Sequence, residues 1–227
     1  MRVLVVDIGG TNVKILATGQ KAPRKFPSGP GLTPKAMVAG VKQLAGDWKY
    51  DVVAIGYPGR VHAGKILAEP HNLARGWRGF DFTSAFGCPV RVINDAAMQA
   101  LGSYRSGLLL FLGLGTGLGA ALVADGVVVP MELAHVPYKN GTWEDYLGVR
   151  SLRRRGRKRW QKHVEYGTAR LMDALSPDDI VLGGGNAKKL KKLPKGCRLG
   201  DNAHAFTGGF RLFETTSMPH NASTRSR

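Results

Sequence analysis

Cysteine and the acidic residues are both scarce in this chain of 227 residues. The two cysteines, Cys88 and Cys197, exclude a disulfide scaffold, are too few for a cysteine-based zinc site and fit a reducing compartment. Asp and Glu number 16 against 33 Lys and Arg, so the net charge is +17. Because 43% of the residues are hydrophobic, the chain is not of the disordered class and can bury a sizeable core.

Long hydrophobic runs are lacking as well. Residues 3–6 are only four apolar residues, too short for the hydrophobic region of a signal peptide. The uncharged stretch 106–124 is long enough to span a bilayer, but glycines at 107, 113, 115, 117 and 119 interrupt it. This pattern favours two strands around a glycine turn. We therefore expect no membrane segment and a cytoplasmic location.

In the first half of the chain, short apolar runs alternate with helical patterns. Strands are predicted at residues 2–8, 13–17, 52–55 and 90–93, and helices from 33 to about 44 and from about 95 to 104. Thr33 and Pro34 supply the N-cap and the first-turn proline of the first helix. Segments 20–32 and 56–80 are rich in Gly and Pro and predict loops.

A second unit begins near Ser106. Strands are predicted at 108–112, 119–124, 127–129 and 180–182, an amphipathic helix at 157–175, and a further helix opened by Gly183 to Gly185. Strands and helices thus alternate in two halves, each with a glycine-rich strand turn near its start, which predicts a two-lobed α/β protein. Its lobes would span residues 1–105 and 106–200. The polar residues 216–227 predict a disordered tail.

The first candidate site is the turn after the first predicted strand. Gly9 and Gly10 allow the backbone to approach a phosphate closely, while Thr11 adds a hydroxyl and Lys14 a positive charge. Asp7, at the strand end, can hold Mg²⁺ directly or through water. The alternative is a plain β-hairpin with a Gly-Gly turn. The Asp, Thr and Lys at these offsets favour phosphate binding.

A second glycine turn lies between two predicted strands. Gly115, Thr116 and Gly117 offer bare backbone amides and one hydroxyl, the same donors as the first turn. No helix directly follows these glycines, which argues against a Rossmann site, and no Gly-Lys-Ser/Thr follows, which argues against a Walker A loop. Alone, the glycine spacing is weak evidence for phosphate binding, since packed hairpins also use glycine. As a second candidate phosphate loop in the same chain, it is stronger evidence.

Asn94 and Asp95 stand at a strand end that leads into a helix. A carboxylate there can accept a proton from a substrate hydroxyl while the adjacent amide orients the same substrate. The alternative is a helix N-cap, for which Asn and Asp are common residues. Taken in isolation, the pair favours the cap.

A third polar group comprises Glu132, His135 and Glu144. Carboxylates and an imidazole suit a polyol, because each can bind adjacent hydroxyls. The alternative is the start of a surface helix. Glu132 and His135 could also suggest a metal, but two ligands are too few for a closed zinc site.

Basic residues gather in two runs that contain no acids. The runs are Arg150, Arg153, Arg154, Arg155, Arg157, Lys158, Arg159 and Lys162, and then Lys188, Lys189, Lys191, Lys192, Lys195 and Arg198. Such a charge of one sign attracts long polyanions, of which inorganic polyphosphate and nucleic acid are two. The alternative is a solvated helix face.

The order of these groups along the chain resembles the repressor–open-reading-frame–kinase (ROK) family of sugar kinases. The resemblance rests on the segments around Asp7 to Lys14, Asn94-Asp95, Gly115 to Gly117, Glu132 to His135 and Gly183 to Gly185, and covers roughly residues 2–213. Segments 143–148, 157–160, 183–189, 200–202 and 208–212 are most similar to the polyphosphate glucokinase branch of the family.

The resemblance implies a two-lobed actin-like ATPase (ribonuclease-H-like) fold with the active site in a cleft between the lobes. It also implies that a C-terminal helix at about 201–215 joins the first lobe and that Asp95 is the general base. The sugar would be held by Asn94, Asp95, Glu132, His135, Glu144, Asn72 and Gly59. The phosphoryl group would be held by Gly9, Gly10, Thr11, Lys14, Gly115, Thr116 and Gly117, and adenosine would lie at Gly183, Gly184 and Gly185.

The chain departs from the family pattern at one point. Many members carry a cysteine-rich zinc motif between the histidine and the last sugar-binding glutamate, whereas residues 136–143 contain no cysteine. We therefore expect no zinc, with His135 contacting the sugar only. The family's repressors carry a DNA-binding helix-turn-helix before the first loop; here the first strand begins at residue 2, so we expect none.

The activity implied is transfer of a phosphoryl group from polyphosphate, with ATP as an additional donor, to the 6-hydroxyl of glucose or a related hexose. The resemblance also implies Mg²⁺ and a homodimer, without a specific nucleic acid partner. Two alternatives stay open: a strictly ATP-dependent hexokinase acting on glucose, mannose or fructose, and a non-catalytic binder of polyanions or nucleic acid on a kinase scaffold.

Overall fold

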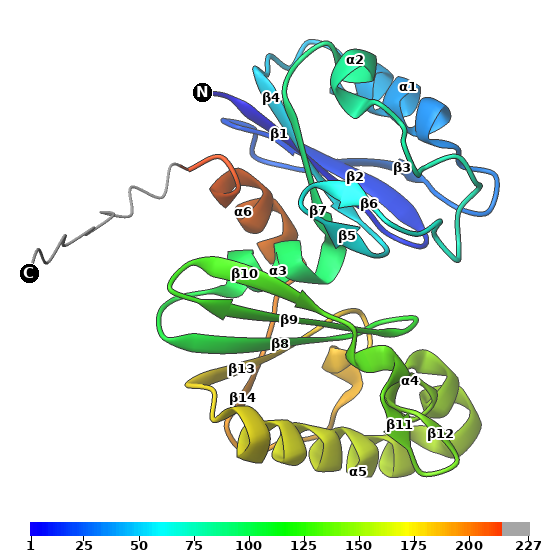
Figure 1. Cartoon of the computed structure of the whole chain (residues 1–227), viewed down its shortest axis with the longest axis vertical. Helices are drawn as coiled ribbons and strands as arrows, with labels where there is room; N and C mark the ends of the chain where they lie inside the picture. Colours follow the sequence, from blue (N-terminus) through cyan, green and yellow to red (C-terminus); the bar gives the residue numbers. More distant parts are fainter. Residues whose placement is uncertain (215–227) are drawn as a thin grey trace, which may run out of the picture.

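Two five-stranded sheets form the frame of the molecule, one from each half of the chain (Figure 1). The computed structural model describes residues 1–214, and the predicted disordered tail at 216–227 lies outside them. Helices cover the outer faces, and two further helices lie between the sheets (Figure 1). The predicted α/β architecture is confirmed. In the described residues, no helix has both the length and the apolar character needed to cross a bilayer.

The first sheet has the strand order β3-β2-β1-β4-β7. Its strands are β1 Val3–Ile8, β2 Asn12–Ala17, β3 Arg24–Pro27, β4 Val52–Tyr57 and β7 Val90–Asn94. β1 and β4 are buried along their whole length because both faces of the sheet are covered, which explains their continuous apolar runs. The strand β3 corrects the loop predicted at 20–32: an edge strand with only one apolar residue carries little sequence signal.

The second sheet repeats this arrangement with the order β10-β9-β8-β13-β14. Its strands are β8 Leu108–Leu114, β9 Leu118–Ala124, β10 Val127–Met131, β13 Asp179–Gly183 and β14 Cys197–Leu199. Two small hairpins accompany the sheets, β5 Val61–His62 with β6 Lys65–Ile66, and β11 Pro137–Tyr138 with β12 Gly141–Thr142. All strands predicted for this half are present, and β14 was not predicted.

Each predicted helix has a counterpart, two of them with a different extent, but the short helices Phe82–Phe86 and Trp143–Leu147 were not predicted. They are α1 Pro34–Ala45, α2 Phe82–Phe86, α3 Asp95–Ser103, α4 Trp143–Leu147, α5 Val149–Leu175 and α6 His204–Arg211, with 3-10 turns η1 Leu133–His135 and η2 Ala187–Lys189. α5 begins before the predicted residue 157, with a kink at Gly156, whose φ is 76°. The helix predicted after Gly185 is only the single turn η2, because the segment returns quickly to β14.

α3 joins the two sheets. Ala97 and Ala100 pack against Leu109 and Phe111 of the second sheet, whereas Met98 packs against the first sheet and α6. The contact with α6 is close, since a Cβ on Gly102 would collide with α6 backbone. Asp95, the first residue of α3, is thereby fixed between the two sheets.

Candidate functional site

The carboxyl ends of three neighbouring parallel strands bring two carboxylates to one edge of the first sheet. Asp7 of β1 pairs with Gly56 of β4, and Gly56 pairs with Ile93 of β7, two residues before Asp95. Gly56 packs closely against α3, because a Cβ there would displace the end of the Met98 side chain. Ligands of open α/β sheets bind at the carboxyl ends of the strands. The edge that carries both carboxylates is therefore the natural place for a substrate.

Asp95 is the carboxylate with the most perturbed environment. Its side chain is partly buried, and its Oδ1 accepts a hydrogen bond of 2.8 Å from the backbone N–H of Ala96. Burial raises the pKa of Asp95 to about 7, and the negative charges of Asp7 and Glu132 add to the effect. A carboxylate with this pKa is divided between its two protonation states at neutral pH, as a general base requires.

Asp7 is buried, with 8% of its surface exposed. Burial raises its pKa, and the ammonium group of Lys14, whose Nζ lies 3.8 Å from Oδ2, partly opposes the shift. The distance is long for an ion pair, so Lys14 neutralises Asp7 only in part. This leaves an under-neutralised carboxylate beside the first glycine turn.

Asn94 occupies the helix cap that the sequence favoured. Its Oδ1 accepts from the N–H of Ala97 at 3.0 Å, and its Nδ2 donates to the carbonyl of Gly59 at 3.1 Å. Asp95 is the first residue inside the helix, so its carboxylate does not make the N-cap hydrogen bond. The cap and the candidate base are thus two different residues, and Gly59 lies beside them.

The first glycine turn is held by a residue that sequence reasoning missed. The Oγ of Ser28 donates to the carbonyl of Gly9 at 2.6 Å, and its N–H donates to the carbonyl of Thr11 at 3.0 Å. Asn72 also lies beside this turn, because its Nδ2 is 3.9 Å from the position of a Cβ on Gly10. Ser28 follows β3 directly, so the unpredicted edge strand is what brings it to the turn.

The second glycine turn is supported by Glu144 of α4. The N–H of Leu118 donates to Oε2 of Glu144 at 3.3 Å, and a Cβ on Gly117 would collide with that carboxylate. The carbonyl of Thr116 accepts from the N–H of Val149 at 3.3 Å, which ties the turn to the start of α5. Glu144, expected to hold sugar, therefore contacts the second turn through its carboxylate.

The third glycine segment packs against the second turn. Gly184 has a φ of +78° and lies against the backbone of Leu114. Asn186 fixes the contact, since its N–H donates to the carbonyl of Leu114 at 3.0 Å and its Nδ2 to the carbonyl of Gly115 at 2.9 Å. Asn186 was not predicted as a site residue; its place next to Gly185 was the available signal.

Glu132 and His135 follow the end of β10, and both are exposed. Glu132 is near enough to Asp95 for its charge to raise the pKa of that carboxyl. The interval predicted to lack zinc forms the β11–β12 hairpin. Within residues 1–214, no three His, Cys, Asp or Glu side chains are grouped so that they could hold a metal ion.

One contact links the second glycine turn to the candidate base. Gly119, where β9 leaves the second turn, packs so closely against Ala96 that a Cβ would come 2.7 Å from the Ala96 side chain. Because Ala96 follows Asp95, the second turn and the candidate base are neighbours. Asp7, Glu132 and the second glycine turn therefore lie near the start of α3, where Asp95 stands.

Comparison with known proteins gives three related results. The profile of the ROK family matches residues 3–130. The polyphosphate glucokinase of Mycobacterium tuberculosis (strain CDC 1551 / Oshkosh) is 25% identical over 210 residues, which cover 82% of this chain and 78% of that protein.

Solved structures resemble the whole described fold. The inorganic polyphosphate/ATP-glucomannokinase of Arthrobacter sp. strain KM has a TM-score of 0.80 at 22% identity, covering 94% of this chain and 99% of that one. A ROK glucokinase from Streptomyces griseus, in complex with glucose and AMPPNP, has a TM-score of 0.76 at 17% identity. The match covers 93% of this chain and 99% of that one. These likenesses confirm the predicted two-lobed, actin-like ATPase fold.

Proposed function

Since the chain belongs to the ROK family, we propose that it is a sugar kinase that phosphorylates the 6-hydroxyl of glucose. We propose inorganic polyphosphate as the donor, with ATP as an additional donor. The observation that carries this proposal is the environment of Asp95: a carboxyl whose pKa is raised to about 7, next to two glycine turns.

In the proposed reaction, Asp95 accepts the proton of the sugar hydroxyl as its oxygen attacks the terminal phosphorus of the donor. The new bond joins that oxygen to phosphorus, and the bond from phosphorus to the bridging oxygen of the donor breaks. Base catalysis of this kind contributes roughly 10²–10⁴-fold. Glu132, whose charge also raises the pKa of Asp95, would bind the sugar.

The two glycine turns would bind the phosphoryl group. Phosphoryl transfer needs in-line placement and stabilisation of the charge on the phosphoryl oxygens more than covalent help. The backbone N–H groups of Gly10 and Gly117, with the Thr11 hydroxyl and Lys14, are the donors that we assign to this task; the N–H of Gly115 is already paired with the carbonyls of Gly113 and Gly117, which shapes the second turn. Loss of one such donor typically costs about 3 kcal/mol of transition-state stabilisation.

The residues present fit a Mg²⁺ ion. Mg²⁺ is usually held by one or two carboxylates together with substrate phosphates and water, and the under-neutralised Asp7 beside the first turn is a donor of this kind. When bound, Mg²⁺ would neutralise charge on the donor oxygens. Asp7 would hold it directly or through water.

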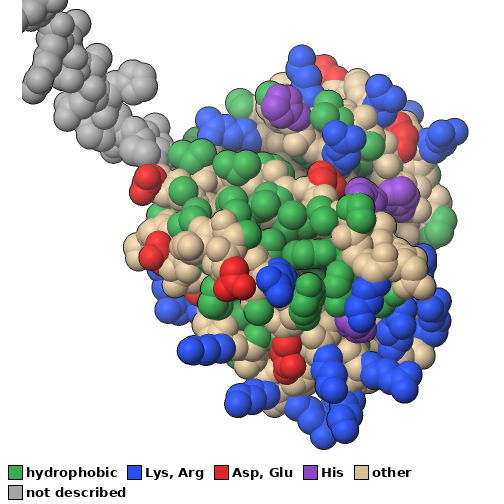
Figure 2. Space-filling view, turned by 60° about the horizontal axis from the view of Figure 1, so that its bottom comes forward, with side chains coloured by type: hydrophobic (Ala, Val, Ile, Leu, Met, Phe, Trp, Pro, Cys, Tyr) green, Lys and Arg blue, Asp and Glu red, His purple; other side chains and the backbone are tan. Residues whose placement is uncertain are grey.

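Polyphosphate is favoured as donor by the charge of the second half. The two basic runs lie on α5 and beyond, and they meet where the N–H of Lys191 donates to Oε1 of Gln161 at 3.0 Å. Figure 2 shows many more Lys and Arg than Asp and Glu side chains on the face that it presents. The names of the M. tuberculosis and Arthrobacter relatives point to the same donor.

One assay grid tests the proposal. Glucose, mannose and fructose are each offered with polyphosphate and with ATP in the presence of Mg²⁺, and sugar phosphate is measured. We expect the highest kcat/KM for glucose with polyphosphate. Turnover with ATP alone would support the strictly ATP-dependent hexokinase instead. Tight binding of polyphosphate or nucleic acid without turnover on any sugar would support the non-catalytic binder.

A further inference from the structure

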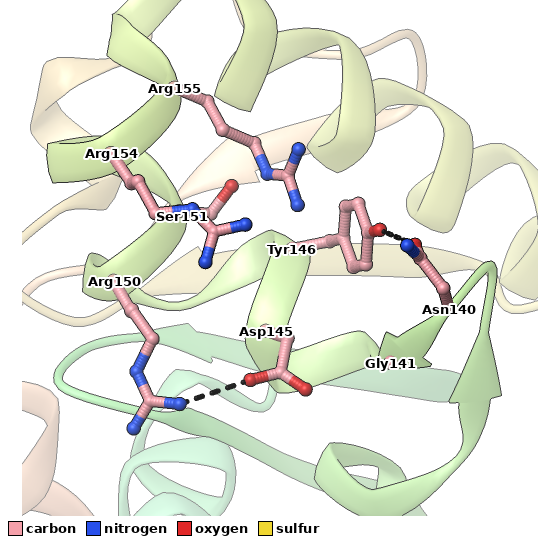
Figure 3. A pocket seen from close by; sticks show the side chains of 8 residues that line it. All are labelled: Asn140, Gly141, Asp145, Tyr146, Arg150, Ser151, Arg154 and Arg155. Carbon is pink, nitrogen blue, oxygen red and sulfur yellow. Dashed lines mark hydrogen bonds and ion pairs between the residues drawn. The ribbon is translucent and has the colours of Figure 1, made fainter.

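A separate pocket lies between α4, the β11–β12 loop and the first turns of α5 (Figure 3). Its volume is about 220 Å³. The residues that line it are Asn140, Gly141, Asp145, Tyr146, Arg150, Ser151, Arg154 and Arg155. None of them was given a role in binding the sugar or the transferred phosphoryl group, and its three arginines belong to the first basic run.

The single acid of the pocket is already neutralised. Oδ1 of Asp145 lies 3.2 Å from Nη1 of Arg150, and its Oδ2 accepts from the N–H and the hydroxyl of Thr142, both at 3.1 Å. By contrast, no carboxylate within the described residues approaches Arg154 or Arg155 to within 4.0 Å. The pocket therefore carries an excess of positive charge.

Two buried polar atoms of the pocket lack a hydrogen-bond partner in the described part of the chain. They are the Oγ of Ser151, a residue with 1% of its surface exposed, and the Nε of Arg155. Leaving a buried donor unpaired is unfavourable, and native proteins rarely do so without a reason. That both atoms belong to residues lining one pocket points to a ligand that pairs with them.

The neighbouring groups fix these donors in place. The guanidinium carbon of Arg155 lies 4.3 Å from the centre of the Tyr146 ring, and the Tyr146 hydroxyl donates to Oδ1 of Asn140 at 2.5 Å. Figure 3 shows Arg154, Arg155 and Ser151 on α5, facing Tyr146 and Asn140 across the pocket. Since Oδ1 of Asn140 is occupied as an acceptor, its amide N–H groups remain as donors.

The lining thus offers N–H and O–H donors with positive charge, which is the chemistry of an oxyanion site. Planar guanidinium groups match the oxygens of phosphate in pairs, and charge-assisted hydrogen bonds of this kind are strong. We propose that this pocket binds a phosphate group, through Ser151, Arg154 and Arg155.

The pocket is distinct from the glycine turns. Glu144 of α4 directs its carboxylate to the N–H of Leu118, whereas the next residue, Asp145, lines the pocket. Successive residues of a helix point about 100° apart, so α4 separates the two places. The phosphate could belong to free inorganic phosphate or to an inner unit of a polyphosphate chain whose end lies at the turns.

Calorimetric titration of the full chain with inorganic phosphate, at constant ionic strength, tests the pocket. Arg155→Lys keeps the charge but removes Nε and the planar fork, and Ser151→Ala removes the buried hydroxyl. Each should weaken phosphate binding about tenfold. Arg153→Ala is the matched control, because it removes a charge from the same turn without lining the pocket. It should change the affinity much less.

Thermal unfolding adds a second readout. Without phosphate, Ser151→Ala should be at least as stable as the wild type, because an unpaired buried hydroxyl is removed. With phosphate, only proteins with an intact pocket should gain stability. The proposal is overturned if the wild type does not bind phosphate saturably, or if Arg153→Ala weakens binding as much as Arg155→Lys.

Kinetics then identify the source of the phosphate, and only this step rests on the proposed kinase activity. If the pocket holds the polyphosphate chain, Arg155→Lys raises the KM for polyphosphate and leaves the KM for ATP unchanged. If it holds free phosphate, the variant loses phosphate binding while both KM values stay unchanged. Failure of the kinase proposal would leave the titration and the unfolding readouts intact, so the two proposals fail separately.

Discussion

The two sheets share one topology but differ in chemistry at equivalent positions. In the first sheet, Asp7 is the next-to-last residue of β1 and pairs with Lys14 on one side and Gly56 on the other. In the second, the next-to-last residue of β8 is Gly113, which pairs with Gly119 and Gly183. The same frame thus presents a carboxylate in one half and bare backbone in the other.

The distribution of charge sharpens this contrast. Asp95 and Asp7, whose charge helps to raise the pKa of Asp95, belong to the helix that leaves the first sheet and to that sheet itself. The two basic runs and the pocket at Arg155 belong to the second half. We infer that the first half supplies the base that activates the sugar hydroxyl, whereas the second half supplies most of the positive charge that attracts the anionic donor.

The largest expected effect is the loss of the base. Asp95→Asn should fold normally, because an asparagine Oδ1 can still accept from the N–H of Ala96. Its kcat should fall by roughly 10²–10⁴-fold, since no group then accepts the hydroxyl proton. Steady-state kinetics with glucose and the better donor measure this, with Asp47→Asn as a control that removes an exposed carboxylate outside the site. Near-normal turnover in Asp95→Asn would show that Asp95 is not the general base and serves only at the start of the helix.

Asn94 and Asp95 also show what sequence reasoning could reach. The end of the strand and the start of the helix could be predicted from the sequence, because apolar runs and capping preferences are local signals. The sequence did not show whether Asn94 or Asp95 caps the helix. Asn94 caps through a local bond from the N–H of Ala97, but its amide is also oriented by the carbonyl of Gly59, which comes from another part of the chain and reaches Nδ2 only in the folded state.

The residues that hold the glycine turns could not be predicted from the sequence for the same reason. Ser28, Glu144 and Asn186 each hold a turn by contacts that span 19 to 71 residues of sequence. The short elements that carry them, such as β3 and α4, have five residues or fewer and little apolar periodicity. Their existence depends on the packing around them, so pattern alone could not predict them.

The next effect concerns stability. Because the pKa of Asp95 is about 7 in the folded chain and 3.8 is its ordinary value, the native state binds more protons than the unfolded state between these values. The free energy of unfolding should therefore fall as pH rises from about 4 to about 7 and then level off. Asp95→Asn removes this penalty, so at pH 8 it should exceed the wild type by up to about 4 kcal/mol.

Denaturant unfolding at pH 4.5 and pH 8 measures the difference. At pH 4.5 Asp95 is protonated in the native state but already mostly ionised in the unfolded state, so the two proteins should differ by only about 1 kcal/mol; at pH 8 the gap should be several times larger. An equal gap at both pH values would show that the substitution acts through packing and that Asp95 has an ordinary pKa.

A smaller effect separates the two roles of the second turn. Gly117→Ala should displace Glu144, since the added Cβ collides with its carboxylate, and should raise the KM for glucose about tenfold. In Gly115→Ala the added Cβ meets nothing within 4 Å, so the turn keeps its shape. Its methyl group would enter the space assigned to the donor and raise the donor KM alone. Identical kinetic profiles for the two variants would contradict the assignment.

The smallest effect tests the charge of the second half. Because exposed charges are screened by salt, the KM for polyphosphate should rise severalfold between low and physiological ionic strength, whereas the KM for glucose should barely change. Replacing Lys158 and Arg159 by Gln should flatten this dependence. Replacing Lys21 and Lys35, two exposed lysines of the first half, should leave it as in the wild type, because those charges lie outside the basic runs. A polyphosphate KM that does not respond to salt would remove the basic runs from donor binding and, with them, the electrostatic difference between the two halves.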